Sequence, residues 1–244
     1  MAYSEFLNGE VILMANTRPL THFLICDGSS QSRSQFPDLF DIIKYTYGGS
    51  GDEFRLPNLT PPLADMAYHI RTGAGLFGPV GSFSEASGVL GDIRYLAGPV
   101  RTYPTCPLAN GSLLPVATNP GSFSVLGYRF GGSGSNFQLP TVPDLGPTPG
   151  VTAYFLNAGV YPLQSAGYAE SLMSQIRLAT PTYVEAGFLP CDGATYYKEL
   201  NTLLSYLLGN NFGGDQNTYA VPTLPQIAGI DQRICAEGYF PDFA

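Results

Sequence analysis

One pattern of short motifs occurs three times in this sequence, and it limits the possible folds more than any other feature. A glycine after Asp or Asn lies 20 residues before the first glycine of an aromatic-Gly-Gly tripeptide and 29 residues before a proline. The first glycines of the three copies, Gly28, Gly111 and Gly193, lie 83 and 82 residues apart. A fixed period that fills the chain indicates tandem copies of one folding unit. We therefore expect three modules, over residues 1–87, 88–169 and 170–244.

The positions that recur in every copy are interpreted as structural. They are Cys26, Asp27, Gly28, Gly48, Gly49 and Pro57 in the first copy, Asn110, Gly111, Gly131, Gly132 and Pro140 in the second, and Cys191, Asp192, Gly193, Gly213, Gly214 and Pro222 in the third. The Asp and Asn positions predict an Asx turn, and their interchange argues against a general base. The glycine pairs predict positive φ or a close backbone approach. The prolines are expected to close the loop that follows.

The local patterns within one copy predict short strands, one short helix and many turns. β-branched and aromatic residues predict strands over residues 10–15 and 22–26, and Pro37 begins a short pattern of helical spacing. The third copy shows this helix most clearly, over residues 198–208. Each copy ends in an apolar segment, and we align residues 68–73 with 154–159 and 233–238. The predicted class is α+β, rich in β-structure.

Composition excludes several kinds of partner. The net charge is −8, so no basic surface for a nucleic-acid backbone is expected. No apolar stretch approaches the roughly 18 residues of a membrane span, and the first nine residues lack the features of a signal peptide. Only 12% of residues are charged, which predicts a neutral surface suited to packing in an assembly or to contact with a sugar. The four cysteines are too few for a disulfide scaffold, so we expect reduced thiols.

No motif for catalysis, metal or cofactor binding survives inspection. Gly73–Gly78 has the spacing of a dinucleotide loop, but Pro79 and Gly81 follow where a helix would have to begin. The two histidines, His22 and His69, stand apart and no Cys-x-x-Cys spacing occurs. The third position equivalent to Cys26 and Cys191 is Ala109, which is typical of a small buried site and not of a metal ligand. No catalytic residue, metal or cofactor is therefore assigned.

The combined motif resembles the bacteriophage tail collar domain. It consists of an apolar strand, a Cys-Asp-Gly turn, a short helix, a Tyr/Phe-Gly-Gly turn and a Phe-x-Leu-Pro segment. The resemblance implies a non-enzymatic virion protein, a component of a tail fibre, tail tip or collar that acts in assembly or host-surface attachment. Its implied partners are other virion proteins and, as an alternative, a host-surface glycan. The basic Asp-Leu-Arg-Gly-Arg segment that usually follows in the family is absent. The recurring proline is followed instead by Asn58-Leu59-Thr60, Thr141-Val142-Pro143 and Thr223-Leu224-Pro225.

Two other functions stay open at this point, a capsid or neck decoration protein and a glycan-degrading enzyme of the tailspike type. No receptor-binding residue is assigned. The equal spacing in the copies predicts that the modules close around one pseudo-threefold axis, because head-to-tail contacts between like units can form a ring. One chain would then imitate a trimer of single-module relatives. The long connectors, residues 61–91 and 143–169, are expected to cross between modules.

Overall fold

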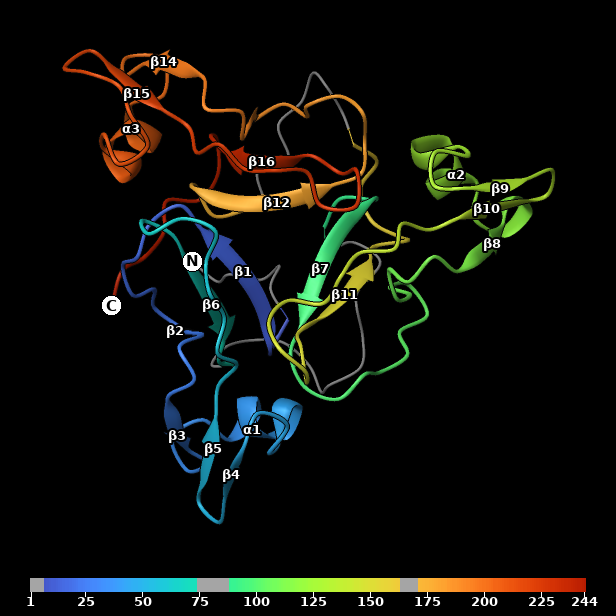
Figure 1. Cartoon of the computed structure of the whole chain (residues 1–244), viewed down its shortest axis with the longest axis horizontal. Coiled ribbons are helices and arrows are strands. Elements are labelled where there is room, and N and C mark those ends of the chain that lie inside the picture. The colour runs from blue at the N-terminus through green and yellow to red at the C-terminus, as the bar shows by residue number, and fades with distance from the viewer. Residues whose placement is uncertain (1–6, 74–87, 163–170) are drawn as a thin grey trace.

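Three short strands, one from each module, form a closed triangle at the centre of the molecule (Figure 1). They are β1 (Glu10–Met14), β7 (Asp92–Leu96) and β12 (Gln175–Ala179). The computed structural model describes residues 7–73, 88–162 and 171–244. Each of these strands pairs antiparallel with both of the others. The predicted pseudo-threefold arrangement is therefore confirmed.

The register is the same at all three corners of the triangle. The fourth and fifth residues of one strand pair with the second and first residues of the next. These pairs are Leu13 and Met14 with Ile176 and Gln175, Leu178 and Ala179 with Ile93 and Asp92, and Tyr95 and Leu96 with Val11 and Glu10. Every corner joins the C-terminal end of one strand to the N-terminal end of the next. The contacts are therefore heterologous, and they close into a ring after three steps.

The central strands are extended outward by antiparallel neighbours from their own modules. β6 (Ala67–Arg71) pairs with β1, β11 (Thr152–Phe155) with β7 and β16 (Gln232–Cys235) with β12. β2 (Phe23–Ile25) and β13 (Phe188–Pro190) then flank β6 and β16. Together they form one eight-stranded sheet with the triangle at its centre.

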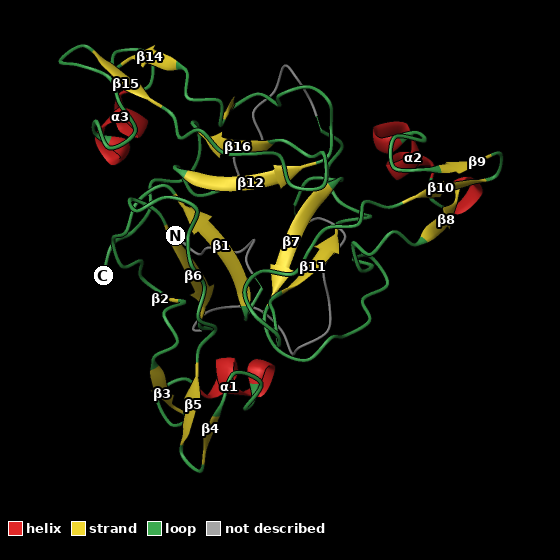
Figure 2. Ribbon diagram, in the orientation of Figure 1, coloured by secondary structure: helices red, strands yellow, loops and turns green. Residues whose placement is uncertain are grey.

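Each module also projects a small lobe of hairpin strands and one short helix (Figure 2). Lobe 1 contains β3 (Ser30–Ser32), α1 (Pro37–Ile43), β4 (Gly49–Ser50) and β5 (Glu53–Arg55). Lobe 2 contains β8 (Leu113–Pro115), η1 (Val116–Thr118), α2 (Pro120–Leu126), β9 (Gly132–Ser133) and β10 (Asn136–Gln138). Lobe 3 contains β14 (Thr195–Tyr197), α3 (Thr202–Leu208) and β15 (Thr218–Ala220). The predicted class, α+β with much β-structure, is confirmed.

Each lobe packs its apolar core against residues of the next module. The core of lobe 1 includes Ala97 and Val151 from module 2, and the core of lobe 2 includes Leu178 and Ile230 from module 3. The core of lobe 3 is completed by a third set of the same kind, from module 1: Leu13, Ala15 and Met66. No module completes its core without residues of a neighbour. This fits a unit of about 82 residues, which is small enough to be only marginally stable alone.

Two of the sequence-based expectations are wrong in detail. The third helix begins at Thr202 and not at Lys198, because Thr195–Tyr197 forms a strand and Lys198 donates its backbone N–H to the Asn217 carbonyl. The alignment of Tyr68 with Tyr154 and Arg233 is also wrong, since strand pairing makes Ala153 and Gln232 the equivalents of Tyr68.

Other expectations lie partly or wholly outside the described residues. The module boundaries at 87/88 and 169/170 fall there, as does nearly all of the Gly73–Gly78 segment. The expected connectors, residues 61–91 and 143–169, contain the strands β6 and β11, so only their remaining residues can join modules. Among the described helices, none has the length and apolar character required to cross a bilayer.

Candidate interaction sites

The recurring Asp or Asn residue forms an Asx turn in every module. Its Oδ1 atom accepts the backbone N–H two residues ahead, at distances of 2.9 Å for Asp27, 3.2 Å for Asn110 and 2.9 Å for Asp192. In the first two modules the following glycine donates its N–H to the carbonyl of the recurring proline, Pro57 or Pro140. These residues therefore fix the chain direction between the central sheet and the lobe.

The second glycine of each pair lies where no side chain fits. Gly49, Gly132 and Gly214 have φ of 101°, 92° and 104°, in the region that favours glycine. A Cβ atom there would come within 2.5 Å of a carbonyl oxygen on the facing strand in all three modules. The glycine pair is thus required by the close approach of two backbones within the lobe.

The recurring cysteines lie in the separate apolar cores of their lobes. Cys26, Cys191 and the equivalent Ala109 are 1%, 4% and 2% exposed, and both thiols are unpaired. Burial raises the pKa of both thiols, so the reactive thiolate is disfavoured. These residues act as small apolar core groups.

Replacing Cys26 by alanine is expected to be mild, because module 2 already has Ala109 at this position. The lost contacts should cost on the order of 1 kcal/mol of unfolding free energy. Denaturant titration of Cys26→Ala checks the value, and Cys191→Ala provides a matched second variant. A Cys26–Cys191 bridge detected by non-reducing mass spectrometry would contradict the assignment.

Buried ion pairs link the modules at two corners of the triangle. Arg94 on β7 contacts Glu10 on β1 at 2.8 Å, and Arg177 on β12 pairs with Asp92 on β7. All four side chains are at most 12% exposed. The third corner has Ile12 and Gln175 at the equivalent positions, so it carries no charge.

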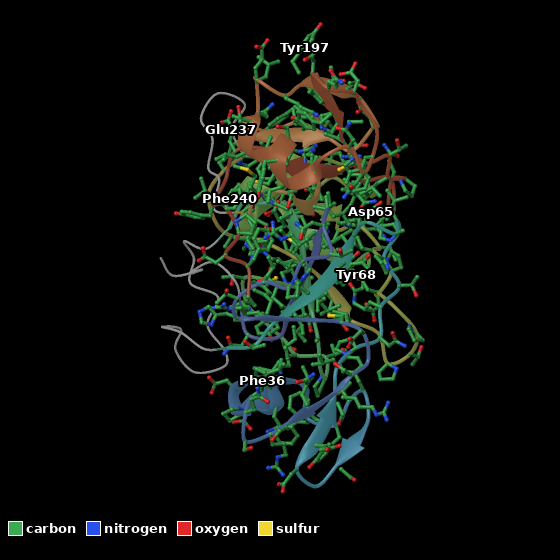
Figure 3. All side chains as sticks on the ribbon, turned by 90° about the vertical axis from the view of Figure 1, so that its left-hand side faces the viewer. Phe36, Asp65, Tyr68, Tyr197, Glu237 and Phe240 are labelled. Carbon is green, nitrogen blue, oxygen red and sulfur yellow. The ribbon has the colours of Figure 1, made fainter. Side chains whose placement is uncertain are left out.

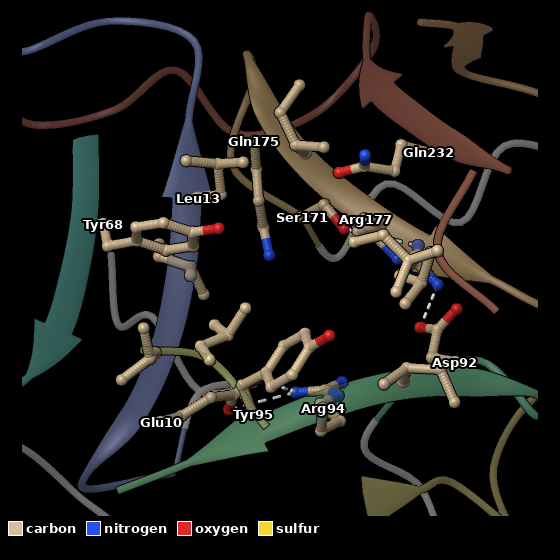
Figure 4. Close-up of a pocket in the computed structure, with 17 residues that line it drawn as sticks. Glu10, Leu13, Tyr68, Asp92, Arg94, Tyr95, Ser171, Gln175, Arg177 and Gln232 are labelled. Carbon is tan, nitrogen blue, oxygen red and sulfur yellow. Dashed lines mark hydrogen bonds and ion pairs between the residues drawn. The ribbon is translucent and has the colours of Figure 1, made fainter. Parts of the chain in front are cut away.

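A cavity of about 60 Å³ lies between the three central strands (Figure 4). The side chains of Tyr68, Tyr95 and Gln175 point toward it, together with the arginines of the two ion pairs. The Tyr95 hydroxyl is buried and has no hydrogen-bond partner among the described residues. The volume suits one or two water molecules, which would satisfy this hydroxyl. The cavity belongs to the structural centre and is too small for an organic ligand.

Lobe 3 exposes an apolar surface that the other lobes lack. This surface, called the lobe 3 patch, consists of Tyr197, Leu200, Leu203 and Tyr206, which are 60%, 68%, 53% and 71% exposed. The ring of Tyr206 contacts Phe240 with centroids 6.4 Å apart. Tyr197 and Phe240 both lie on the side of the molecule shown in Figure 3. The equivalent residues are Ser32, Gln35, Asp38 and Asp41 in lobe 1 and Pro115, Thr118, Gly121 and Ser124 in lobe 2.

A second and larger cavity lies where lobe 1 meets module 2. It has a volume of about 440 Å³. Its walls are the Asx turn at Asp27 and residues 55–59 of module 1, and residues 145–151 of module 2. This cavity is here called the junction cavity. Its volume falls within the range of about 300–1,000 Å³ typical of sites for small ligands.

The phage tail collar domain model matches the chain three times, over residues 9–61, 91–145 and 174–229. These matches cover well over half of the chain and follow the three modules. The chain belongs to the phage tail collar domain family. No curated protein and no solved structure matches it significantly. Membership makes the chain a phage tail structural protein of the virion that contacts other virion proteins, and the resemblance seen in the sequence is confirmed.

His69 of this collar protein has structural surroundings. His69 is fully buried, and its ring nitrogens lie 3.2 Å from the carbonyl oxygens of Ala67 and Arg18. Burial lowers the pKa of His69. Within residues 7–73, 88–162 and 171–244, no group of three or more His, Cys, Asp or Glu side chains is placed to hold a metal ion.

Sequence reasoning missed the lobe 3 patch and the junction cavity. Both arise where one collar module departs from the other two, whereas the recurring motifs consist of residues common to all three. A comparison of non-identical residues at equal repeat positions, such as Leu203 against Asp38, contains the signal for the patch. The junction cavity follows from a difference in loop length between modules. The loop lies after the recurring proline, so the equal spacings before that proline do not reveal it.

Proposed function

We propose that this chain is a non-enzymatic component of a phage tail fibre, tail tip or collar that docks on another virion protein through lobe 3. The proposal is carried by the lobe 3 patch, where Leu200, Leu203 and Tyr206 stand at positions that are polar in lobe 1 and are Thr, Gly and Ser in lobe 2. A cluster of exposed apolar side chains of this kind is typical of a protein interaction site. Tyrosines are also enriched in the centres of such interfaces.

Another virion protein is the occupant that fits the family and the asymmetry best. A ring with three like lobes would offer three equivalent contacts, but only one lobe of this chain carries the apolar residues. One chain therefore engages one partner subunit through a defined edge. The patch is also continuous with the contact between modules 3 and 1, because Phe240 packs on Phe243, which forms a bridge with Leu20. Rigid support of this kind favours a stable interface.

Leu203→Asp combined with Leu200→Gln is expected to remove the protein from assembled particles. Both side chains are more than half exposed, and lobe 1 folds with Asp38 and Gln35 at these positions, so stability should change by no more than about 0.5 kcal/mol. Complementation of a deletion phage, followed by quantitative immunoblotting of purified particles, should show at least a tenfold loss. Asp38→Asn in lobe 1 is the matched control and should be incorporated normally.

Three results would refute this assignment. Normal incorporation of the double variant would show that lobe 3 is not the docking surface. Localisation of the wild-type chain on tailless heads by immunoelectron microscopy would favour the decoration protein. Release of reducing sugars from host polysaccharide, lost on mutation of one Asp or Glu, would favour the tailspike-type enzyme.

A further inference from the structure

We infer that the junction cavity is a binding site for one or two sugar units of a neutral glycan. This inference rests on the proposed function, since a tail component of the virion is carried to the glycans of the host surface. The cavity is formed by two modules, and its lining combines an apolar floor with a polar rim.

The cavity exists at this junction because module 2 has a longer loop than module 3. Leu145 and Val151 exchange backbone hydrogen bonds of 2.9 and 2.8 Å around five intervening residues. The equivalent pair in module 3, Ile227 and Ile230, exchanges bonds of 3.0 and 2.9 Å around only two. The three additional residues, 147–149, form a wall opposite lobe 1. Module 3 therefore lacks the wall at its junction with lobe 2.

The wall is fixed in place by contacts with lobe 1. The Tyr47 hydroxyl donates to the Gly150 carbonyl at 3.3 Å and accepts the Gly98 N–H at 3.0 Å, so one side chain ties two segments of module 2 to lobe 1. Leu59 lies directly against Gly146, where an added Cβ would come within 2.5 Å of its side chain. A cavity held open in this way pays little ordering entropy when a ligand enters.

The lining matches the two faces of a sugar ring. Leu56, Leu59 and Val151 are at most 8% exposed and supply apolar surface for C–H groups. Arg55 and Asn58 are exposed on the rim, and their side chains make no hydrogen bond with any described residue. Arg55 donates, whereas Asn58 both donates and accepts, as ring hydroxyls require.

The charge of the lining favours a neutral ligand and binding without cleavage. Arg55 is the one cation and Asp27 the one acid in the lining, so their charges balance. Glycoside hydrolysis usually needs a pair of carboxyl groups, and the cavity offers only that of Asp27. Asp27 already accepts the Ser29 N–H with one oxygen. The position of Arg55 is Gln138 in module 2 and Ala220 in module 3, which makes this rim specific to lobe 1.

Saturation-transfer NMR with glucose, galactose, N-acetylglucosamine, rhamnose and maltose tests the inference on the full-length protein. At least one of these sugars should bind, and Arg55→Gln with Asn58→Thr should weaken its affinity about tenfold through lost hydrogen bonds. These substitutions copy the residues of module 2, so the fold should be kept. Gln138→Ala at the equivalent position of lobe 2 is the control and should leave binding unchanged.

A second variant replaces residues 146–150 by the Ala-Gly turn of module 3, which removes the wall and should abolish binding. Absence of binding by every sugar, or binding unchanged in both variants, would overturn the inference. Incorporation of the protein into particles is measured in parallel. A chain present in tails that binds no sugar refutes the sugar site alone, whereas a chain absent from particles refutes the proposed function.

Discussion

A fragment of residues 1–169 is expected to lose cooperative unfolding. This fragment lacks β12, so both β1 and β7 lose a pairing partner. It also exposes Leu13 and Met66, which complete the core of lobe 3, and opens the core of lobe 2, which needs Leu178. Two modules would each lose a buried face that an ordered structure requires. Thermal unfolding followed by circular dichroism should show a broad or absent transition, with poorly dispersed amide NMR signals.

The control keeps every contact and breaks only the chain. A full-length protein with a protease site after residue 169, cut after folding, retains all three strand pairings and should still melt in a single transition. If the isolated fragment 1–169 melts as sharply as the full chain, the closed ring is not needed for stability and the argument from shared cores fails.

Arg94→Ala is expected to destabilise the protein by about 3–5 kcal/mol, because it leaves the Glu10 carboxylate buried without its cation. Glu10 is 3% exposed as a side chain and cannot recover full hydration. Denaturant titration gives the change in unfolding free energy directly, provided the slope of the transition is unchanged. Lys44→Ala, which removes a half-exposed ion pair with Asp41 on lobe 1, is the control and should cost less than about 1 kcal/mol.

The pseudo-symmetry supplies a variant that should rescue this loss. The third corner has Ile12 and Gln175 where this corner has Arg94 and Glu10. Gln175 keeps the same local bond as Glu10, since each side chain accepts a backbone N–H three residues earlier, from Leu172 and Leu7. Arg94→Ile with Glu10→Gln should therefore be much more stable than Arg94→Ala. Equal destabilisation of both variants would show that the cost is not that of an unpaired charge.

The sequence predicted most of what is common to the three modules and little of what distinguishes them. Equal spacing from Gly28 to Pro57 and its equivalents predicted one lobe three times, because turns and close backbone approaches require particular residue types. The ring also followed from like units in tandem. The register of the last strand was misjudged at Tyr68 and Tyr154, since an aromatic residue marks an apolar position without fixing which neighbour it faces.

The side-chain pairs between modules could not be predicted from the sequence, for a physical reason. Arg94 and Glu10 are 84 residues apart, and neither lies in a local pattern that identifies its partner. Their contact depends on the closure of the triangle, which brings the third residue of one strand to the first residue of another. The junction cavity likewise depends on how the loop of residues 145–151 lies against a different module.

Closure of the triangle within one polypeptide makes its assembly independent of concentration. Three separate chains would dissociate on dilution, and their melting temperature would fall with the protein concentration. Here the three strands are tethered, so each meets its neighbours at a high effective concentration, set by the length of the linking chain. A particle released into a large volume of medium would therefore keep this ring intact, however few copies surround it.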